Sequence, residues 1–562
     1  MKHHPFTPER HIGVVYQIEG SFADVTFIAA TRLPKSHFGE YLGRGEVGEF
    51  VVVDVGGCAA FGRLLRVGAL TTNVDTLSHS DRRIPADGRI QLLSTLNLDG
   101  SSTRGILKYP KVGDHVYAAS SEAILGVIGA VEGLSLGRLS VDESVEVSVP
   151  LARLFGRHLA IVGATGSGKS WTLGHLAESV ASLSGKMILI DATGEFHTLG
   201  SSATHLAFGS LSDEPAGTSL VGIPHFMMRE SDRNAFLNPS SGTQVPKLRE
   251  AIRTLRLSAA IVADSCADAT HTSLVAEDGS ITKAGVQMST FGSATRAYGA
   301  IVEDPHAPFD IKLIGIQVQR ECVWPTDRNH TDCYGAMDYT QIGYVSTLVS
   351  RVNDLLQTPE IMRVIDPGAR TGNALDEIKE WIEDPSKHVL RISLRNLTFA
   401  SHLREIVVNI LGQAFLTWAR EGAFKEHPLV VAVDEAHQFF DVTVGDEFSS
   451  TRLNAFDLIA KEGRKYGLTV CIATQRPGDL PAGVLSQVGM TIVHRLTDGR
   501  DRQRVEQAAA EIDHSATRLL PGLVPGEAIL MGVDFPVPVS VRIHRPLSPP
   551  ASDGPKYSNW HA

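Results

Sequence analysis

The chain has 562 residues, of which 43% are hydrophobic and 20% charged, and its net charge at pH 7 is −11. This composition is ordinary for a globular protein of roughly two to four domains, and the acidic balance excludes the overall basic signature of a simple nucleic-acid binder, so contact with DNA would need local positive charge. The five cysteines are scattered and odd in number, which argues against a disulfide framework, and the apolar runs are strand-sized rather than membrane-sized.

The N-terminal segment carries no apolar signal core, so we expect a cytoplasmic protein without a membrane partner. Residues 10 to about 130 predict a β-rich domain. Short β-branched or apolar runs at 14–18, 23–29, 49–55 and 59–67 are separated by glycines and polar turns, which is typical of a small barrel or sandwich. Residues 130–150 predict a connector with one further strand at 145–149, and we assign 1–150 to this domain and its linker.

From residue 151 the pattern changes to alternating strands and helices, as in a parallel α/β sheet. We expect strands at 159–162, 187–191, 388–394, 429–434 and 469–474, with helices that include 169–184, 401–420 and 452–466. The alternation breaks between 225 and 385, which predicts an α/β core of 151–224 and 386–545 with an inserted subdomain, 225–385, that has helices at 244–264 and 341–358. Residues 265–340 are polar and hard to assign. The tail, 546–562, is expected to be mobile or to reach onto a neighbour.

The most informative motif is Gly163-Ala164-Thr165-Gly166-Ser167-Gly168-Lys169-Ser170, which matches the nucleotide-phosphate loop. It lies between an apolar strand and a helix without proline, where a glycine-rich turn and the helix N-terminus direct N–H groups at a phosphate. Lys169 would reach the β- and γ-phosphates, and the Ser170 hydroxyl would hold Mg²⁺. The candidate ATP-binding residues are Gly163, Thr165, Gly166, Ser167, Gly168, Lys169, Ser170 and Trp171. A chance match is the alternative, and the flanking elements argue against it.

The run Leu429-Val430-Val431-Ala432-Val433-Asp434-Glu435 is an apolar strand that ends in two carboxylates. Asp434 would hold Mg²⁺ through its water shell, and Glu435 would orient and deprotonate the attacking water. A strand that simply ends in polar residues is the alternative. The presence of the phosphate loop in the same chain favours the catalytic interpretation.

A third strand ends in Thr474-Gln475, and Gln475 is placed to contact the γ-phosphate or the attacking water. Arg464 lies 11 residues before it in the run Lys461-Glu462-Gly463-Arg464-Lys465-Tyr466-Gly467. An arginine on a helix end is usually a solvated charge. An arginine that reaches a neighbouring subunit's phosphate, however, raises the hydrolysis rate by large factors.

Together these pieces resemble the HerA–FtsK group of ring-forming ATPases, and HerA in particular. The resemblance covers about 10–240 and 385–545 and leaves 265–340 unexplained. It rests on residues 157–170, Asp191-Ala192-Thr193-Gly194-Glu195-Phe196, Val433-Asp434-Glu435-Ala436-His437, 462–467 and Thr474-Gln475-Arg476-Pro477. It implies a RecA-like P-loop core with an N-terminal barrel like the HAS barrel of that family and a largely helical insertion.

The resemblance also implies roles for single residues. Gln475 would be the sensor, Arg464 the arginine finger that acts in trans, and Arg157 a second basic residue that touches nucleotide across the subunit boundary, although Arg153 is close by. Asp191 and Glu195 either support the water or magnesium site or belong to a polar strand-end turn. His437 is more simply a local polar group beside the acidic motif.

The function implied is an ATP-dependent helicase or translocase, a homo-hexameric ring that threads double-stranded DNA using ATP and Mg²⁺. HerA-like motors work with a partner that docks on the barrel face, such as a NurA-like nuclease in DNA end processing, or a sirtuin-like NAD-consuming enzyme or another nuclease in anti-phage defence. Arg452, Lys461 and Lys465 are candidates for gripping DNA. The alternative is an ATP-binding ring scaffold that activates a partner effector, with DNA pumping secondary. A membrane-tethered pump of the same group is less favoured.

Overall fold

The computed structural model describes residues 5–27, 36–37, 40–41, 45–69, 86–129, 133–368, 371–446, 449–508, 516–533 and 537–552. The chain divides into two compact units, each built from separate stretches of sequence. The first unit comprises 1–185, 428–437 and 469–562, and the second comprises 186–427 and 438–468. Each unit is described by itself. Among the described residues, no helix combines the length and the apolarity needed to cross a bilayer.

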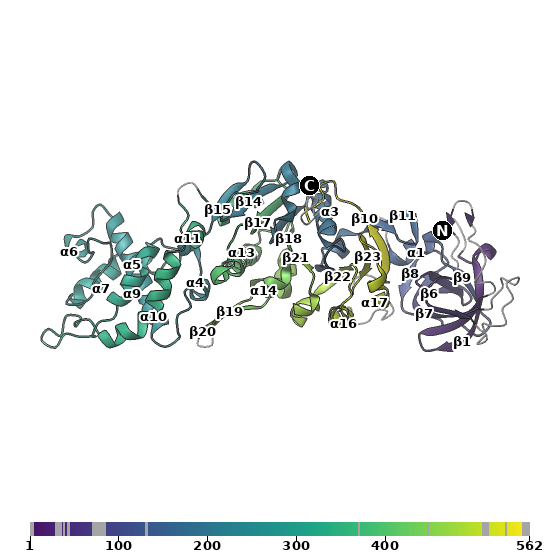
Figure 1. The fold of residues 1–562 in the computed structure, drawn as a ribbon, viewed down its shortest axis with the longest axis horizontal. Helices are drawn as coiled ribbons and strands as arrows, with labels where there is room; N and C mark the ends of the chain where they lie inside the picture. The colour runs from purple at the N-terminus through teal and green to yellow at the C-terminus, as the bar shows by residue number, and fades with distance from the viewer. Residues whose placement is uncertain are drawn as a thin grey trace, which may run out of the picture. The chain divides into compact units, whose positions relative to one another are not determined.

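The N-terminal part of the first unit is a closed β-barrel, which confirms the barrel alternative of the sequence prediction (Figure 1). Six strands follow the order β2-β1-β9-β5-β6-β7, and pairing of β2 with β7 closes the ring, while the short β8 pairs antiparallel with β7. The strands are β1 (His11–Glu19), β2 (Phe22–Phe27), β5 (Phe50–Asp54), β6 (Cys58–Ala69), β7 (Ala86–Asn97), β8 (Ser102–Arg104) and β9 (His115–Ala118).

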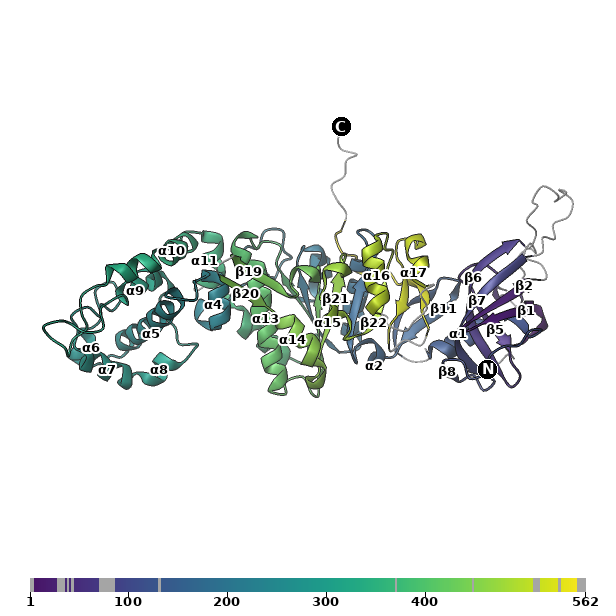
Figure 2. The same ribbon diagram turned by 90° about the horizontal axis from the view of Figure 1, so that it is seen from below.

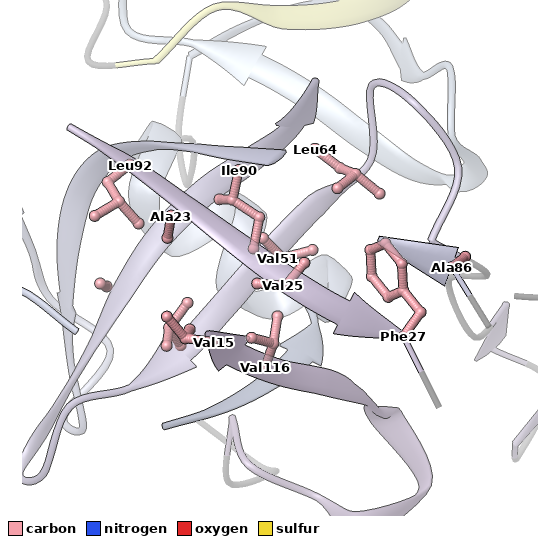
Figure 3. Packing of buried hydrophobic residues seen from close by; sticks show 12 residues of the cluster. Val15, Ala23, Val25, Phe27, Val51, Leu64, Ala86, Ile90, Leu92 and Val116 are labelled. Carbon is pink, nitrogen blue, oxygen red and sulfur yellow. The ribbon is translucent and has the colours of Figure 1, made fainter. Parts of the chain in front are cut away.

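The barrel encloses an apolar core made by alternate residues of its strands. Figure 3 shows Val15, Val25, Val51, Ile90 and Val116 gathered inside the barrel, and all five are buried. In β7 the burial alternates with a period of two over most of its length, which is the expected pattern for strands with one face inside. The helix α1 (Ser121–Ile128) follows β9.

The connector after the barrel differs from its prediction, because it contains two strands rather than one. The strands β10 (Leu134–Leu139) and β11 (Asp142–Val149) form an antiparallel pair, and β10 also pairs with β24 (Val539–Ile543) near the C-terminus. Gly137 explains why the first strand is easily missed: a Cβ there would lie 2.8 Å from the carbonyl carbon of Arg542, so the position needs glycine for close strand approach.

The rest of the first unit is an α/β sheet in which the phosphate-loop strand lies between two parallel neighbours, while the strands toward the connector pair antiparallel. The strand order from the connector onward is β11-β10-β24-β23-β22-β12-β21-β18. The added strands are β12 (His158–Val162), β18 (Leu429–Val433), β21 (Leu468–Thr474), β22 (Val488–Val493) and β23 (Glu527–Met531). The helices are α2 (Leu151–Leu154), α3 (Lys169–Ser182), α15 (Ala482–Leu485), α16 (Gly499–Ala508) and α17 (Ala516–Leu519).

The beginning of the C-terminal tail lies along α3 of its own chain, where the sequence predicted a mobile segment or a contact with a neighbour. The backbone N–H groups of Leu547 and Ser548 donate to the carboxylate of Glu178 at 2.8 and 2.7 Å. The guanidinium of Arg545 lies 5.0 Å over the ring of Trp171. Two hydrogen bonds and one cation–π contact therefore order this stretch against the helix that follows the phosphate loop.

The second unit contains five parallel strands, in the order β13-β17-β14-β15-β16. The strands are β13 (Lys186–Asp191), β14 (Thr204–Phe208), β15 (Ser219–Gly222), β16 (Gly372–Asn373) and β17 (Val389–Ser393). The unit also contains α12 (Ala374–Glu383), α13 (Leu403–Arg420) and α14 (Ala455–Glu462), and α14 packs on α13. The predicted helix 452–466 was wrong at its start, because 449–453 form β20 of a hairpin with β19 (Val442–Asp446).

The helices of the insertion form a distinct layer of the second unit. In Figure 2, α5, α9 and α10 lie side by side, and contacts join α9 to both of the others. The helices are α4 (Glu230–Leu237), α5 (Gln244–Ala263), α6 (Ala269–Thr272), α7 (Met288–Ala297), α8 (Gly299–Glu303), α9 (Ile314–Arg320), α10 (Tyr339–Leu356) and α11 (Pro359–Ile365). The unassigned stretch 265–340 is therefore short helices and turns, packed on α5 through a small core that includes Leu257, Ile261 and Ile281.

Candidate functional site

The phosphate loop joins β12 to α3 in the first unit. The strand β12 lies between β21 and β22 and is parallel to both, with Val162 opposite Thr474 on one side and Val493 on the other. The loop then turns through Gly166 (φ 69°) and Gly168 (φ 117°), and α3 begins at Lys169. These two positions need glycine because other L-residues rarely adopt such left-handed backbone angles.

At Gly163 the loop is packed too tightly to accept a side chain. A Cβ at Gly163 would lie 2.5 Å from Ser167 Oγ and 2.6 Å from the Cβ of His494. Ser167 is buried, and its hydroxyl donates to the carbonyl of Ala164 at 2.6 Å. These contacts fix the turn at the N-terminus of α3, which is the arrangement that binds an anionic phosphate.

Lys169 and Ser170 occupy the first turn of α3, as the motif predicts. The Lys169 side chain is buried against the loop, and its Nζ donates to the carbonyl of Ala164 at 3.2 Å. Ser170 is half-buried. A hydroxyl at this position and the carboxylate of Asp434, which is 5% exposed at the end of β18, are oxygen ligands of the kind Mg²⁺ prefers, and substrate phosphates and water would supply the others.

The backbone of the acidic pair is unusual at its second residue. Glu435 has φ 49° and is 8% exposed, so a non-glycine residue holds a left-handed conformation directly after the strand. Such conformations cost free energy and concentrate at functional sites. Here the turn places the Glu435 carboxylate beside the end of β21 rather than continuing along β18.

A chain of side-chain contacts joins the phosphate loop to the acidic pair. The hydroxyl of Thr165 donates to Gln475 Oε1 at 2.5 Å, and Gln475 Nε2 donates to Glu435 Oε1. Gln475 therefore bridges the loop that would hold phosphate and the carboxylate that would activate water. All three residues belong to the first unit, and the sequence had named all three as candidates.

His437 is a contact of the site that the sequence analysis assigned to local structure only. Its Nδ1 lies 3.3 Å from Glu435 Oε2 and 3.2 Å from the hydroxyl of Thr474. Burial lowers the pKa of His437, against an opposing contribution from Glu435. The imidazole of His437 therefore favours the neutral form at neutral pH. It contacts the Glu435 carboxylate without neutralising its negative charge. The sequence signal that could have identified His437 as a site residue is its position two residues after the acidic pair.

His494 was missed altogether, and it lies directly beneath the phosphate loop. It follows β22, its Nδ1 lies 2.9 Å from the carbonyl oxygen of Glu527, and its Nε2 lies 2.8 Å from the hydroxyl of Thr172 in α3. Burial lowers the pKa of His494 to about 4, and the positive charge of Lys169 acts in the same direction. The neutral ring thus ties α3 to the neighbouring strand, through residues too distant in sequence to suggest a motif.

The buried His494 predicts a loss of stability in mild acid. Because its pKa falls from 6.5 in the unfolded chain to about 4 in the folded one, its contribution is complete above pH 6.5 and is lost as the pH falls toward 4. We expect the free energy of unfolding to drop by about 2 kcal/mol between pH 7.5 and pH 5 on this account. Urea denaturation of the wild type and of His494→Gln across this range measures it. In His494→Gln, the free energy of unfolding should depend less on pH by this amount. The control His427→Gln, which changes an exposed histidine, should keep the pH dependence of the wild type.

The remaining candidates occupy different settings. Arg157 is half-buried just before β12, whereas the neighbouring Arg153 donates to the carbonyl of Ile128 at 2.7 Å and is committed to the linker. In the second unit, Arg464 is exposed on the 3-10 turn η8 (Gly463–Tyr466) that follows α14.

Asp191 belongs to a strand-end turn, the second of the two alternatives. Its carboxylate accepts the backbone N–H groups of Gly194 and Phe196 at 2.7 and 3.1 Å. Arg391 also donates to it at 2.7 Å and to Glu214 at 2.6 Å, and all three charged side chains are buried. A carboxylate that is bonded in this way is committed to structure rather than to a water or a metal ion.

Two family models match the chain. Residues 134–279 match the model described as "Helicase HerA, central domain", and residues 404–540 match "Helicase HerA-like C-terminal". Together they span about half of the chain and include the phosphate loop, the acidic pair, Arg464 and Gln475. The central-domain match extends past the α/β core into α5 and the segment after it, which is further than the resemblance drawn from motifs.

Known proteins with related sequences or folds include helicases and coupling proteins. A probable helicase of Methanocaldococcus jannaschii is 24% identical, over 82% of this chain and 76% of its own length. The DNA double-strand break repair helicase HerA of Pyrococcus furiosus is 22% identical, over 77% and 73%. Among solved structures, the plasmid coupling protein TrwB with a non-hydrolysable ATP analogue has a TM-score of 0.44 at 15% identity, covering 76% of this chain and 93% of TrwB. VirB4 of Thermoanaerobacter pseudethanolicus has a TM-score of 0.42 at 12% identity, covering 74% and 96%.

Proposed function

The chain belongs to the HerA–FtsK group of P-loop ATPases, and from that premise we propose that it is an ATP-driven translocase of double-stranded DNA that works as a homo-hexameric ring. One observation carries the hydrolytic part of the proposal. The Thr165–Gln475–Glu435 contacts connect the phosphate loop to the acidic pair, so a γ-phosphate in the loop and a water at Glu435 would be neighbours.

We assign the residue roles on the motifs and on the family resemblance, and the contacts described above are compatible with them. Glu435 takes the proton of the attacking water, and Gln475 positions that water and responds to the γ-phosphate. Lys169 and the N–H groups of the loop bind the phosphates, while Ser170 and Asp434 would hold Mg²⁺, which would supply positive charge to the phosphate oxygens. His437, in contact with Glu435, keeps that carboxylate oriented.

The ring supplies the parts that a single chain lacks. Arg464 of one subunit would reach the γ-phosphate of the next and stabilise negative charge in the transition state, and Arg157 would touch nucleotide across the same boundary. This division of the site makes hydrolysis depend on the subunit interface. It also gives the motor a means to coordinate successive subunits.

The DNA part of the proposal rests on the helicase relatives and on local charge. The net charge of −11 opposes binding at most of the surface, so a few cations per subunit, repeated around a pore, must grip the phosphate backbone. Lys461 and Lys465 are exposed beside Arg464, while Arg452 is exposed on β20 and paired with Asp441. We propose these as the DNA contacts, with a nuclease or another effector docked on the barrel.

The proposal predicts an ATPase that DNA stimulates. ATP hydrolysis by the size-defined oligomer should rise several-fold with linear double-stranded DNA, and the stimulation should disappear as salt is raised, because phosphate contacts release counterions. The measurement compares rates with and without DNA at increasing salt, with Glu435→Gln as the blank. Lys465→Gln should weaken the stimulation, and Lys108→Gln on the barrel is the matched control.

A rate that ignores DNA at every salt concentration would contradict the translocase. It would favour the alternative proposal, a nucleotide-dependent ring scaffold that switches on a partner effector. The same assay, repeated with a co-encoded nuclease or NAD-consuming enzyme in place of DNA, then separates the two functions.

A further inference from the structure

The helical layer of the second unit contains a pocket lined by five arginines that none of the roles above uses. Its volume is about 430 Å³, which falls within the range of about 300–1,000 Å³ typical of small-molecule sites. It opens between α4, α5 and the segment after α8. The lining arginines are Arg229, Arg233, Arg249, Arg253 and Arg256, with Glu230 and Glu303 as the lining acids.

Two of the arginines are neutralised by these acids. Arg249 pairs with Glu230 at 2.5 Å, and Arg253 pairs with Glu303. Arg229 donates hydrogen bonds to the neutral side chains of Gln413 and Thr417 at 2.6 and 2.8 Å, and these do not balance its positive charge. The pocket therefore carries more positive charge than its own carboxylates balance.

The other two arginines, Arg233 and Arg256, are buried, with 8% and 5% of their surfaces exposed. Arg256 donates to the carbonyl oxygens of Val302 and Pro305, and Arg233 donates to that of Met228. In each side chain the Nε has no hydrogen-bond partner within the described part of the chain. A buried guanidinium without a bonded carboxylate is costly, and an anion is the natural complement.

The electrostatics agree with this geometry. Burial lowers the pKa of both arginines, and the charge of Arg256 also lowers the pKa of Arg233. The nearby acids offset this only partly. Burial raises the pKa of Asp232, whose carboxylate accepts the amide of Asn409 and the N–H of Arg229, while Glu303 and Asp304 act on Arg256 from the rim.

The pocket also has an apolar side. Leu248, Ile252 and Pro305 line it together with the arginines. Leu248 and Ile252 lie on the same α5 that carries Arg249, Arg253 and Arg256. A ligand that fits both features has an anionic group and an organic body of moderate size.

We propose that this pocket is a binding site for a phosphomonoester, with the phosphate held by Arg233 and Arg256 and the organic part against Leu248 and Ile252. A phosphate dianion matches adjacent guanidinium groups, because each can donate two parallel hydrogen bonds to its oxygens. The site lies outside the phosphate loop, so it is independent of the proposed ATPase function. The phosphate comes either from a mononucleotide-sized molecule or from a nucleic-acid end.

The test measures binding by calorimetry on the full-length oligomer, with Lys169→Ala in every variant so that the ATP site is weakened equally. The probes are AMP, adenosine and inorganic phosphate. AMP should bind saturably and adenosine should not. Arg256→Gln should weaken AMP about tenfold or more, because it removes charge-assisted hydrogen bonds. Glu303→Gln frees Arg253 and should tighten AMP at low salt.

Arg320→Gln is the matched control, because Arg320 is in the same helical layer and pairs with Asp278 at 3.0 Å outside the pocket. A 5′-phosphorylated oligonucleotide that displaces AMP, when its 5′-hydroxyl counterpart does not, would assign the phosphate to a nucleic-acid end. Failure of oligonucleotides to compete would assign it to a small molecule. The proposal is overturned if AMP does not bind, or if Glu303→Gln fails to tighten AMP and Arg256→Gln changes it no more than Arg320→Gln. Should Arg256→Gln melt early, the Glu303→Gln result alone decides.

Discussion

Glu435→Gln should lower ATP turnover by about 10²–10⁴-fold while ATP still binds, because the amide cannot accept the proton of the attacking water. The substitution keeps the length of the side chain and a carbonyl oxygen that can accept from Gln475. The phosphate loop is unchanged, so the affinity for ATP should stay within a few-fold of the wild type. The expected product is a ring that retains ATP.

Turnover and nucleotide retention are measured on the same preparation. Phosphate release gives the rate, and nucleotide extracted after gel filtration gives the bound fraction. Lys169→Ala, which should lose nucleotide, is the control for binding. Glu143→Gln, a surface carboxylate paired with Arg542, controls for the change in charge. Turnover within threefold of the wild type would remove Glu435 from the role of general base.

Arg464→Ala should have an effect of similar or larger size, about 10³–10⁵-fold on hydrolysis, as for other arginines that act on a neighbour's γ-phosphate. Nucleotide binding should stay near normal, because an arginine finger contributes mainly in the transition state. With rates measured in the absence of DNA, Lys465→Ala is a close control, since it removes the adjacent exposed cation on the same turn. Equal loss in both variants would indicate a general effect of charge.

A mixing experiment tests whether Arg464 acts in trans. Arg464→Ala subunits retain Lys169, and Lys169→Ala subunits retain Arg464, so a mixed ring contains interfaces where both groups are intact. Co-expressed rings, purified through two different tags, should recover part of the activity. No recovery would favour action within one chain. Mixing each variant with wild type shows whether inactive subunits poison the ring, which would otherwise imitate that result.

The parts of the site that the sequence predicted are those whose chemistry fixes local spacing. The phosphate loop needs glycines and a lysine in order, and the acidic pair needs an apolar strand before it, so both could be located from short runs. Gln475 followed from the same logic at the end of β21. The contacts between these residues could not be predicted, because they join side chains 310 and 40 positions apart that only the strand order brings together.

The parts that were missed depend on tertiary contacts or on short elements. His494 matters only because β22 runs beside β12 and brings its ring under Thr172. The segment 265–340 escaped assignment because its helices are too short for periodicity to show. The start of α14 was misplaced because residues before it pair in a hairpin, which overrides their helical pattern.

The sequence predicts the arginine pocket only in part. Arg249, Arg253 and Arg256 are spaced four and three residues apart, which places them on one face of α5. A solvated helix face has the same spacing. The distinguishing fact is that the hydrogen bonds described above for Arg256 and Arg233 go to backbone carbonyl oxygens rather than to carboxylates, and only the packing of α4 and the segment after α8 against α5 reveals it.

The left-handed backbone at Glu435 makes this position a local compromise between folding and chemistry. A residue with a Cβ loses about 1–2 kcal/mol in that conformation, whereas glycine adopts it freely. The chain nevertheless carries glutamate there. The folded state therefore gives up stability at a position whose carboxylate contacts Gln475, and variants selected only for thermal stability would tend to lose hydrolysis through changes at this residue.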